Sequence, residues 1–161
     1  DWPGNDPHRL EAWAADNLAE MPTYYIMDRD ATMAETAATF MPTAKEIAAC
    51  EWLPDGELAF YAAEYSRTGF QGGLNWYRGR LDAALTAGLR LFSGRTIDVP
   101  SIFISGENDW GVYQSPGAVE AMQERVCPRM SGVHLLPGAG HWVQQEQPAA
   151  VVEHIPQFLA S

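Results

Sequence analysis

The pattern of apolar and polar positions divides the chain into a helical first part and a mixed last part. Residues 31–95 are rich in alanine and other good helix formers, and proline and glycine interrupt them repeatedly. This pattern predicts four short helices. In the third, apolar and aromatic side chains recur at helical spacing from Leu58 to Tyr65, and Gly69 is a suitable stop.

After Gly94 the pattern becomes that of alternating strands and helices. Residues 99–104 and 133–136 are short apolar runs rich in β-branched residues, which predict buried strands. Between them, Ser115 and Pro116 suit the N-cap and first position of a helix. The order strand, helix, strand, helix predicts a βαβ unit with parallel strands.

The end of the chain predicts one more helix. It should begin near Pro148, and Pro156 should kink or interrupt it. Its expected buried side chains are Val151, Val152, Ile155 and Phe158. Two strands make a poor domain, because a parallel sheet is normally covered on both faces and extends over more strands. We therefore expect further strands to precede residue 1 and this chain to complete a larger sheet.

Two polar side chains follow the two predicted strands. Asp109 lies in the sequence GENDW after the first strand, and His141 lies in GAGHW after the second. Ligands bind beyond the carboxyl ends of parallel strands, so these side chains should meet at one edge. A carboxylate facing an imidazole fixes the tautomer of the ring, which is the orienting half of a catalytic triad. Glu107 is the alternative acid if the loop is shifted.

The order acid, then histidine, near the end of the chain matches the arrangement of α/β-hydrolases, in which the nucleophile comes earlier. The 161 residues contain no nucleophile elbow of the GxSxG or GxDxG type. The sequence also leaves a simpler interpretation open, in which Asp109 closes a turn and His141 is an ordinary loop histidine.

Charge and composition exclude several other functions. The formal net charge is -11, which repels phosphate backbones and anionic lipid, so neither nucleic acid nor a membrane surface is expected as a partner. No apolar run approaches the roughly 20 residues of a membrane span. The four histidines show no metal-binding spacing and the two cysteines are far apart, so we expect no metal, no cofactor and reduced thiols. A cytoplasmic location is expected.

Four segments together resemble the epoxide hydrolase family of α/β-hydrolases: PTYYIMDRDATMAETAA, GFQGGLNWYRGR, GENDW and GAGHWVQQEQP. The resemblance covers residues 18–161. It implies the C-terminal portion of an α/β-hydrolase fold with a helical cap, without the N-terminal strands and the nucleophile elbow. Residues 1–18 would link the core to the cap, residues 19–95 would form the cap, and residues 96–161 would form the last part of the core.

The resemblance also implies a mechanism and roles for individual residues. In this family an aspartate opens the epoxide to an ester, which a histidine-activated water hydrolyses to a vicinal diol. By motif position, His141 would be the base, Asp109 its acidic partner, and Tyr77 and Tyr25 the cap tyrosines that donate hydrogen bonds to the epoxide oxygen. Tyr24, next to Tyr25, is the alternative for the second tyrosine. The family usually has proline at Gly73 and asparagine at Gly79, and these two changes loosen the backbone near Tyr77.

Three tryptophans flank the predicted site. We expect Trp76, Trp110 and Trp142 to line an apolar pocket that suits an uncharged small-molecule epoxide. Tyr77 and Trp76 can instead be core aromatics of the cap. The chain alone lacks the nucleophile and is expected to be inactive without the missing N-terminal core segment.

Three other functions remain open from the sequence. A haloacid or haloalkane dehalogenase has the same fold and the same aspartate, histidine and acid chemistry, but it stabilises a halide. A serine esterase is further from the observed motifs. A non-catalytic α/β-hydrolase relative or a truncated product would keep the fold for binding alone.

Overall fold

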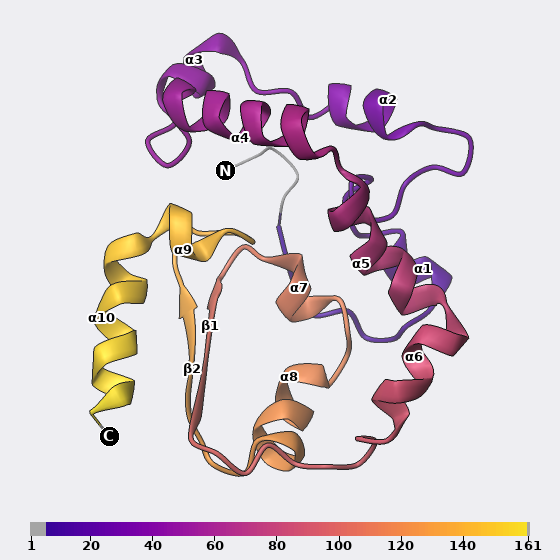
Figure 1. The fold of residues 1–161 in the computed structure, drawn as a ribbon, viewed down its shortest axis with the longest axis vertical. Helices are drawn as coiled ribbons and strands as arrows, with labels where there is room; N and C mark the ends of the chain where they lie inside the picture. The colour runs from indigo at the N-terminus through magenta and orange to yellow at the C-terminus, as the bar shows by residue number, and fades with distance from the viewer. Residues whose placement is uncertain (1–5, 161) are drawn as a thin grey trace.

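The computed structural model describes residues 6–160, whose elements form a set of helices, then one βαβ unit and then two final helices (Figure 1). The helices before the strands are α1 (Ala15–Leu18), α2 (Met33–Ala38), α3 (Ala44–Ala48), α4 (Asp55–Thr68), α5 (Gln71–Leu81) and α6 (Ala83–Arg90). The later elements are β1 (Ser101–Gly106), α7 (Trp110–Tyr113), α8 (Ala118–Ala121), the π-helical turn η1 (Met122–Val126), β2 (Met130–Leu136), α9 (Val143–Glu146) and α10 (Pro148–Leu159).

The two strands pair in parallel, as the sequence predicts. Ile102 lies opposite Gly132, and Gly106 lies opposite Leu136, so the carboxyl ends of both strands reach the same edge. Figure 1 shows α10 on one side of the strand pair and α7 and α8 on the other. The described part of the chain is thus a small piece of an α/β sheet with helices on both sides.

The helix between the strands begins later than predicted. Ser115 and Pro116 form a turn in which the Ala118 amide donates to the Ser115 carbonyl at 3.1 Å. Gly117 then adopts a left-handed conformation with φ of 72°, which ends the turn and serves as the actual N-cap. The prediction of Ser115 as N-cap is therefore wrong by two residues, because glycine can adopt this conformation without steric cost.

The last helix begins at Pro148 as predicted, but Pro156 does not interrupt it. Pro156 is exposed, and Figure 1 shows one continuous helix. The carbonyl that loses its hydrogen bond to a proline can be solvated by water on such a face, so the helix continues.

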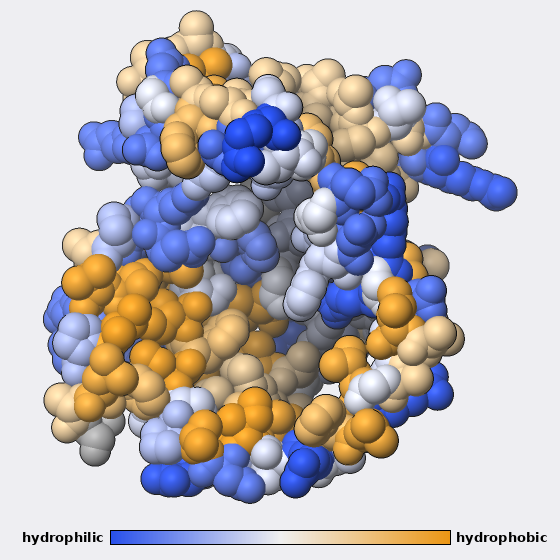
Figure 2. Space-filling model, viewed as in Figure 1, coloured by the Kyte–Doolittle hydropathy of each residue, from blue (hydrophilic) through white to orange (hydrophobic). Residues whose placement is uncertain are grey.

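The expected burial of this helix is only partly correct. Val151 and Phe158 are partly buried, but Val152 is 63% exposed and Ile155 is 43% exposed. Figure 2 shows apolar residues gathered on the surface over α10. The described residues offer only two strands, so the sheet surface is too narrow to cover every apolar position of the helix.

Residues 31–95 contain five helices rather than four. The two shortest, α2 and α3, each begin with a capping box, made by Thr32 with Glu35 and by Thr43 with Glu46. Such reciprocal caps satisfy the first amides of a helix and allow helices this short to form. Helix α4 ends at Thr68, before Gly69 with φ of 70°, as the sequence predicts.

Candidate active site

The loops that follow the two strands are joined by backbone hydrogen bonds. The Glu107 amide donates to the Leu136 carbonyl and the Asn108 amide donates to the Ala139 carbonyl, each at 2.9 Å. Gly106 permits this approach, because a Cβ at its position would lie 2.2 Å from the Ala139 carbonyl oxygen. We call residues 106–109 and 137–142 the strand-end loops. Their close packing brings the predicted acid and histidine to one edge.

Asp109 lies at the N-cap of α7 and is only 7% exposed. Its Oδ1 accepts a hydrogen bond from the Gly111 amide at 2.8 Å, and its Oδ2 accepts one from the Ser105 hydroxyl at 3.4 Å. An N-cap aspartate satisfies helix amides and gains from the positive end of the helix dipole. These two donors hold the carboxylate in one orientation.

His141 faces this carboxylate, as the sequence predicts. Its Nδ1 lies 3.1 Å from Asp109 Oδ2, while its side chain is 64% exposed. A carboxylate oxygen accepts, so Nδ1 is the donor of this pair and the Nε2 lone pair is left for a second partner. The geometry supports a general base oriented by an acid.

Glu107, the alternative acid, has a different role. Its amide bonds to Leu136, and its carbonyl accepts the Tyr113 hydroxyl at 3.0 Å. The imidazole of His141 is paired with Asp109. The acid of the pair is therefore Asp109.

The structure places Tyr25 at the same carboxylate. Its hydroxyl donates to Asp109 Oδ1 at 3.4 Å. Burial of the half-buried ring, followed by the negative charge of Asp109, raises the pKa of Tyr25 well above its ordinary range. Tyr25 is therefore a neutral donor at physiological pH. The ring of Tyr24 packs edge-on against Phe40, with ring centroids 5.0 Å apart. Burial, followed by the negative charge of Asp109, raises the pKa of Tyr24 as well. The hydrogen bond from Tyr25 to Asp109 favours Tyr25 as the second cap tyrosine.

Tyr77 lies on α5 and is 67% exposed. Its electrostatic interaction is the smallest of the influences that raise the pKa of Tyr25. Among the described residues, the structure records no hydrogen bond between the hydroxyls of Tyr77 and Tyr25.

The three tryptophans occupy three different environments. Trp142 is 53% exposed and lies edge-on to His141, with ring centroids 5.4 Å apart. Trp110 is 2% exposed and packs in a core cluster with Leu10 and Met21. Trp76 is 69% exposed on α5. Of the three, Trp142 is the one in contact with the proposed base.

Sequence reasoning missed two residues that support this site. Ser105 donates to Asp109, and Glu146 accepts from the amides of Gly140 and Trp142 at 2.8 and 2.9 Å. Ser105 is the penultimate residue of β1 and carried no distinguishing signal. Glu146 is the fourth residue after the N-cap Trp142, whereas the capping-box pattern places its acid at the third, so that pattern did not identify it.

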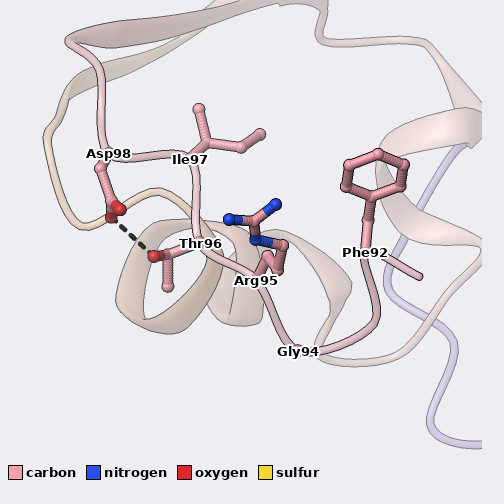
Figure 3. A pocket seen from close by; sticks show the side chains of 6 residues that line it. All are labelled: Phe92, Gly94, Arg95, Thr96, Ile97 and Asp98. Atoms are coloured by element: carbon pink, nitrogen blue, oxygen red, sulfur yellow. Dashed lines mark hydrogen bonds between the residues drawn. The ribbon is translucent and has the colours of Figure 1, made fainter. Parts of the chain in front are cut away.

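The pocket in Figure 3 lies away from this site. Its lining residues all belong to the connection between α6 and β1, and there the Thr96 hydroxyl donates to Asp98 at 2.6 Å. This connection precedes β1, whereas Asp109 follows it, so the pocket and the acid lie at opposite ends of the strand.

Within residues 6–160, no three histidine, cysteine, aspartate or glutamate side chains are grouped in a way that suits a metal ion. In the same range, every helix is too short or too polar to cross a membrane. The cytoplasmic location remains a prediction.

Comparisons with known proteins give a consistent result, although no family model matches the chain. Epoxide hydrolase A of Mycobacterium tuberculosis is 41% identical over 112 residues, which cover 67% of this chain and 32% of that protein. An epoxide hydrolase of Caballeronia sordidicola is 31% identical over 147 residues, which cover 91% of this chain and 41% of that protein.

A solved structure agrees with these relatives. Epoxide hydrolase I of potato (Solanum tuberosum) superimposes with a TM-score of 0.64 and 32% identity, over 81% of this chain and 40% of that protein. The chain therefore spans about a third to two-fifths of the length of the relatives it matches. On the strength of this sequence and fold similarity, the chain belongs to the epoxide hydrolase family and represents the C-terminal part of its α/β-hydrolase fold.

Proposed function

We propose that this chain carries the general base and the epoxide-binding donors of an epoxide hydrolase that converts an epoxide to a vicinal diol. The observation that supports this most strongly is the 3.1 Å contact between His141 Nδ1 and the buried carboxylate of Asp109, at the carboxyl ends of parallel strands. The family to which the chain belongs supplies the reaction class.

In the proposed reaction, an aspartate outside these 161 residues attacks one epoxide carbon. One carbon–oxygen bond of the ring breaks as the new ester bond forms, and the ring oxygen stays on the other carbon as an alkoxide that takes a proton from solvent. His141 Nε2 then removes a proton from water as the water oxygen attacks the ester carbonyl. Collapse of this intermediate breaks the ester bond, and the departing alkoxide takes the proton from the His141 imidazolium to give the diol. The carboxylic acid that forms loses its proton to solvent, which restores the carboxylate. Asp109 stabilises the imidazolium that forms in this step.

Tyr25 and Tyr77 are proposed to donate to the ring oxygen as it gains charge. Neutral phenols can do this without attracting a counter-ion, and burial keeps the pKa of Tyr25 raised. The present bond from Tyr25 to Asp109 is long at 3.4 Å, so the hydroxyl would exchange it for the epoxide oxygen when substrate is bound.

The proposed substrate is an uncharged small-molecule epoxide, which suits the exposed apolar ring of Trp142 beside the base. The proposed partner is an N-terminal α/β-hydrolase core that supplies the nucleophile. Without it, a base and its acid cannot form the ester, so the chain alone should be inactive.

A fusion protein tests this proposal. It consists of the N-terminal core of epoxide hydrolase A, which belongs to the same family, followed by this chain. Hydrolysis of styrene oxide is measured for the fusion, for the chain alone and for the fusion with His141→Ala. We expect diol from the fusion only. A folded fusion that leaves several epoxides unchanged, beside an active unmodified relative, contradicts the proposal.

A dehalogenase is the alternative from the sequence. The relatives described above carry the name epoxide hydrolase, which favours an alkoxide over a halide as the leaving group. The same fusion separates the two reactions, because halide release from a haloalkane without diol formation from an epoxide would support the dehalogenase.

A further inference from the structure

Glu146, at the end of α9, accepts hydrogen bonds from the backbone amides on both sides of His141. Its Oε2 accepts from the Gly140 amide at 2.8 Å, and its Oε1 accepts from the Trp142 amide at 2.9 Å. The carboxylate therefore bridges two amides that have a single residue between them, and that residue is the proposed base.

This arrangement differs from an ordinary helix cap, because the carboxylate also accepts from an amide outside the helix. Trp142 is the N-cap of α9, so a bond to its amide has a local explanation. The Gly140 amide lies outside the helix, two residues earlier, and points to the same carboxylate. A Cβ at Gly140 would lie 3.5 Å from Oε1 and 3.6 Å from Oε2, so the carboxylate also packs directly against this backbone.

A further hydrogen bond holds the loop of residues 137–142. The Ala139 carbonyl accepts from the Asn108 amide at 2.9 Å, which ties the loop to the one that carries Asp109. The imidazole contacts the Asp109 carboxylate and the Trp142 ring but is 64% exposed, so the backbone of its loop also determines where it points.

We propose that Glu146 is a positioning residue, whose two carboxylate oxygens fix the peptide around His141 so that Nδ1 stays on Asp109. This inference rests on the proposed function only for the role of His141 as base. A carboxylate suits the task because both amides donate and both oxygens accept, whereas a glutamine would turn one NH₂ group toward an N–H.

The test uses nuclear magnetic resonance on the full chain and needs no epoxide. Long-range proton–nitrogen correlations report which imidazole nitrogen of His141 carries the proton, and amide exchange reports the hydrogen bonds of Gly140 and Trp142. We compare the parent protein with Glu146→Gln and Glu146→Ala. Glu153→Gln is the matched control, because Glu153 is exposed on α10 and bonds only to the Gln157 side chain among the described contacts.

The parent protein should show the Nδ1–H tautomer of His141. In both Glu146 variants this tautomer should give way to the mixture of a free histidine, and exchange at Gly140 and Trp142 should rise roughly tenfold or more, as expected when a charge-assisted hydrogen bond is lost. The Glu153 control should leave both readouts unchanged.

An unchanged His141 tautomer, together with faster exchange at the two amides, overturns the proposal and leaves Glu146 as a helix cap only. Glu146→Gln keeps the size of the side chain and one acceptor, so it gives a result even if Glu146→Ala unfolds. Because the readout is independent of turnover, this inference can fail or succeed separately from the epoxide hydrolase proposal.

Discussion

The strand-end loops and the helices α4 to α6 each contain an aspartate at the N-cap of a helix, but the two aspartates differ in burial and in their partners. Asp109 and Asp82 are both N-cap aspartates, and each accepts from backbone amides at the start of its helix. Asp109 is buried and also receives the His141 ring and two hydroxyls. Asp82 is exposed, and its side chain accepts only the amides of Ala84 and Leu85 among the described contacts.

This difference shows which parts of the candidate site are held in place by contacts among the described residues. Helices α4, α5 and α6 contain no buried residue within the described structure, so exposed helices define the positions of Tyr77 and Trp76. The strand-end loops combine burial with cross-loop hydrogen bonds, which hold Asp109 and His141 together. Contacts among the described residues therefore hold the positions of Asp109 and His141 more firmly than that of Tyr77.

The largest expected effect is that of Asp109→Ala. It leaves the Gly111 amide, the Ser105 hydroxyl and the His141 ring without their acceptor, so we expect the free energy of unfolding to fall by about 3 kcal/mol. Urea unfolding followed by circular dichroism measures it. The control is Asp82→Ala, which removes only a helix cap and should cost about 1 kcal/mol. Equal losses in the two variants would abolish the contrast between the two regions.

Gly106→Ala should be the next most damaging change. The added methyl group would lie 2.2 Å from the Ala139 carbonyl and 2.3 Å from the Gly140 carbonyl, so the strand-end loops must separate. We expect a loss of about 2 kcal/mol in the free energy of unfolding, which is typical of overpacking. Thermal unfolding provides the measurement. A variant as stable as the parent would show that the two loops are not in close contact.

Gly73→Ala should act in the opposite direction. Gly73 lies inside α5, and a Cβ at its position would meet nothing within 4 Å. Alanine loses less backbone entropy in a helix, so we expect a gain of about 0.5–1 kcal/mol. The same denaturation experiment detects it. Destabilisation would show that α5 is more tightly packed than its exposure indicates.

The smallest expected effect is a pH dependence at His8. The hydrogen bond that His8 Nε2 donates to the Glu20 carboxylate, at 2.9 Å, raises the pKa of His8 above its ordinary value of 6.5. The pair therefore contributes stability that is fully present below pH 6.5 and is lost as the pH rises through the raised pKa. The melting temperature of the parent should therefore fall more over this range than that of Glu20→Gln, which lacks the charged pair. The difference should be small, because about half of each side chain of the pair is exposed to solvent. Identical pH profiles for the parent and Glu20→Gln would show that the pair contributes nothing to stability.

Much of the fold could be predicted from local patterns. The β-branched runs gave the two parallel strands, and Gly69 gave the end of α4, since these signals depend on neighbouring residues. The start of α8 was predicted wrongly, and of the two outcomes predicted for Pro156, a kink or an interruption of α10, the interruption does not occur. Those outcomes depend on the left-handed conformation of Gly117 and on the exposure of Pro156, which local patterns do not reveal.

The candidate site shows a similar division. The pairing of Asp109 with His141 followed from the strand order, because parallel strands end at one edge. The contributions of Ser105 and Glu146 depend on side-chain directions within tightly packed loops, which periodicity does not determine. The sequence could not distinguish Tyr24 from Tyr25 for the same reason, since adjacent residues have no period to separate them, and the hydrogen bond from Tyr25 to Asp109 is what supports the proposal of Tyr25.

Intact-protein mass spectrometry of the fusion protein tests the central claim most directly. The fusion and its His141→Ala variant are mixed with styrene oxide and their masses are followed with time. If His141 activates the water that hydrolyses the ester, the variant should accumulate a covalent adduct with the mass of one epoxide, while the fusion with His141 intact turns it over. An adduct that decays equally fast with and without His141 would contradict the role assigned to the Asp109–His141 pair.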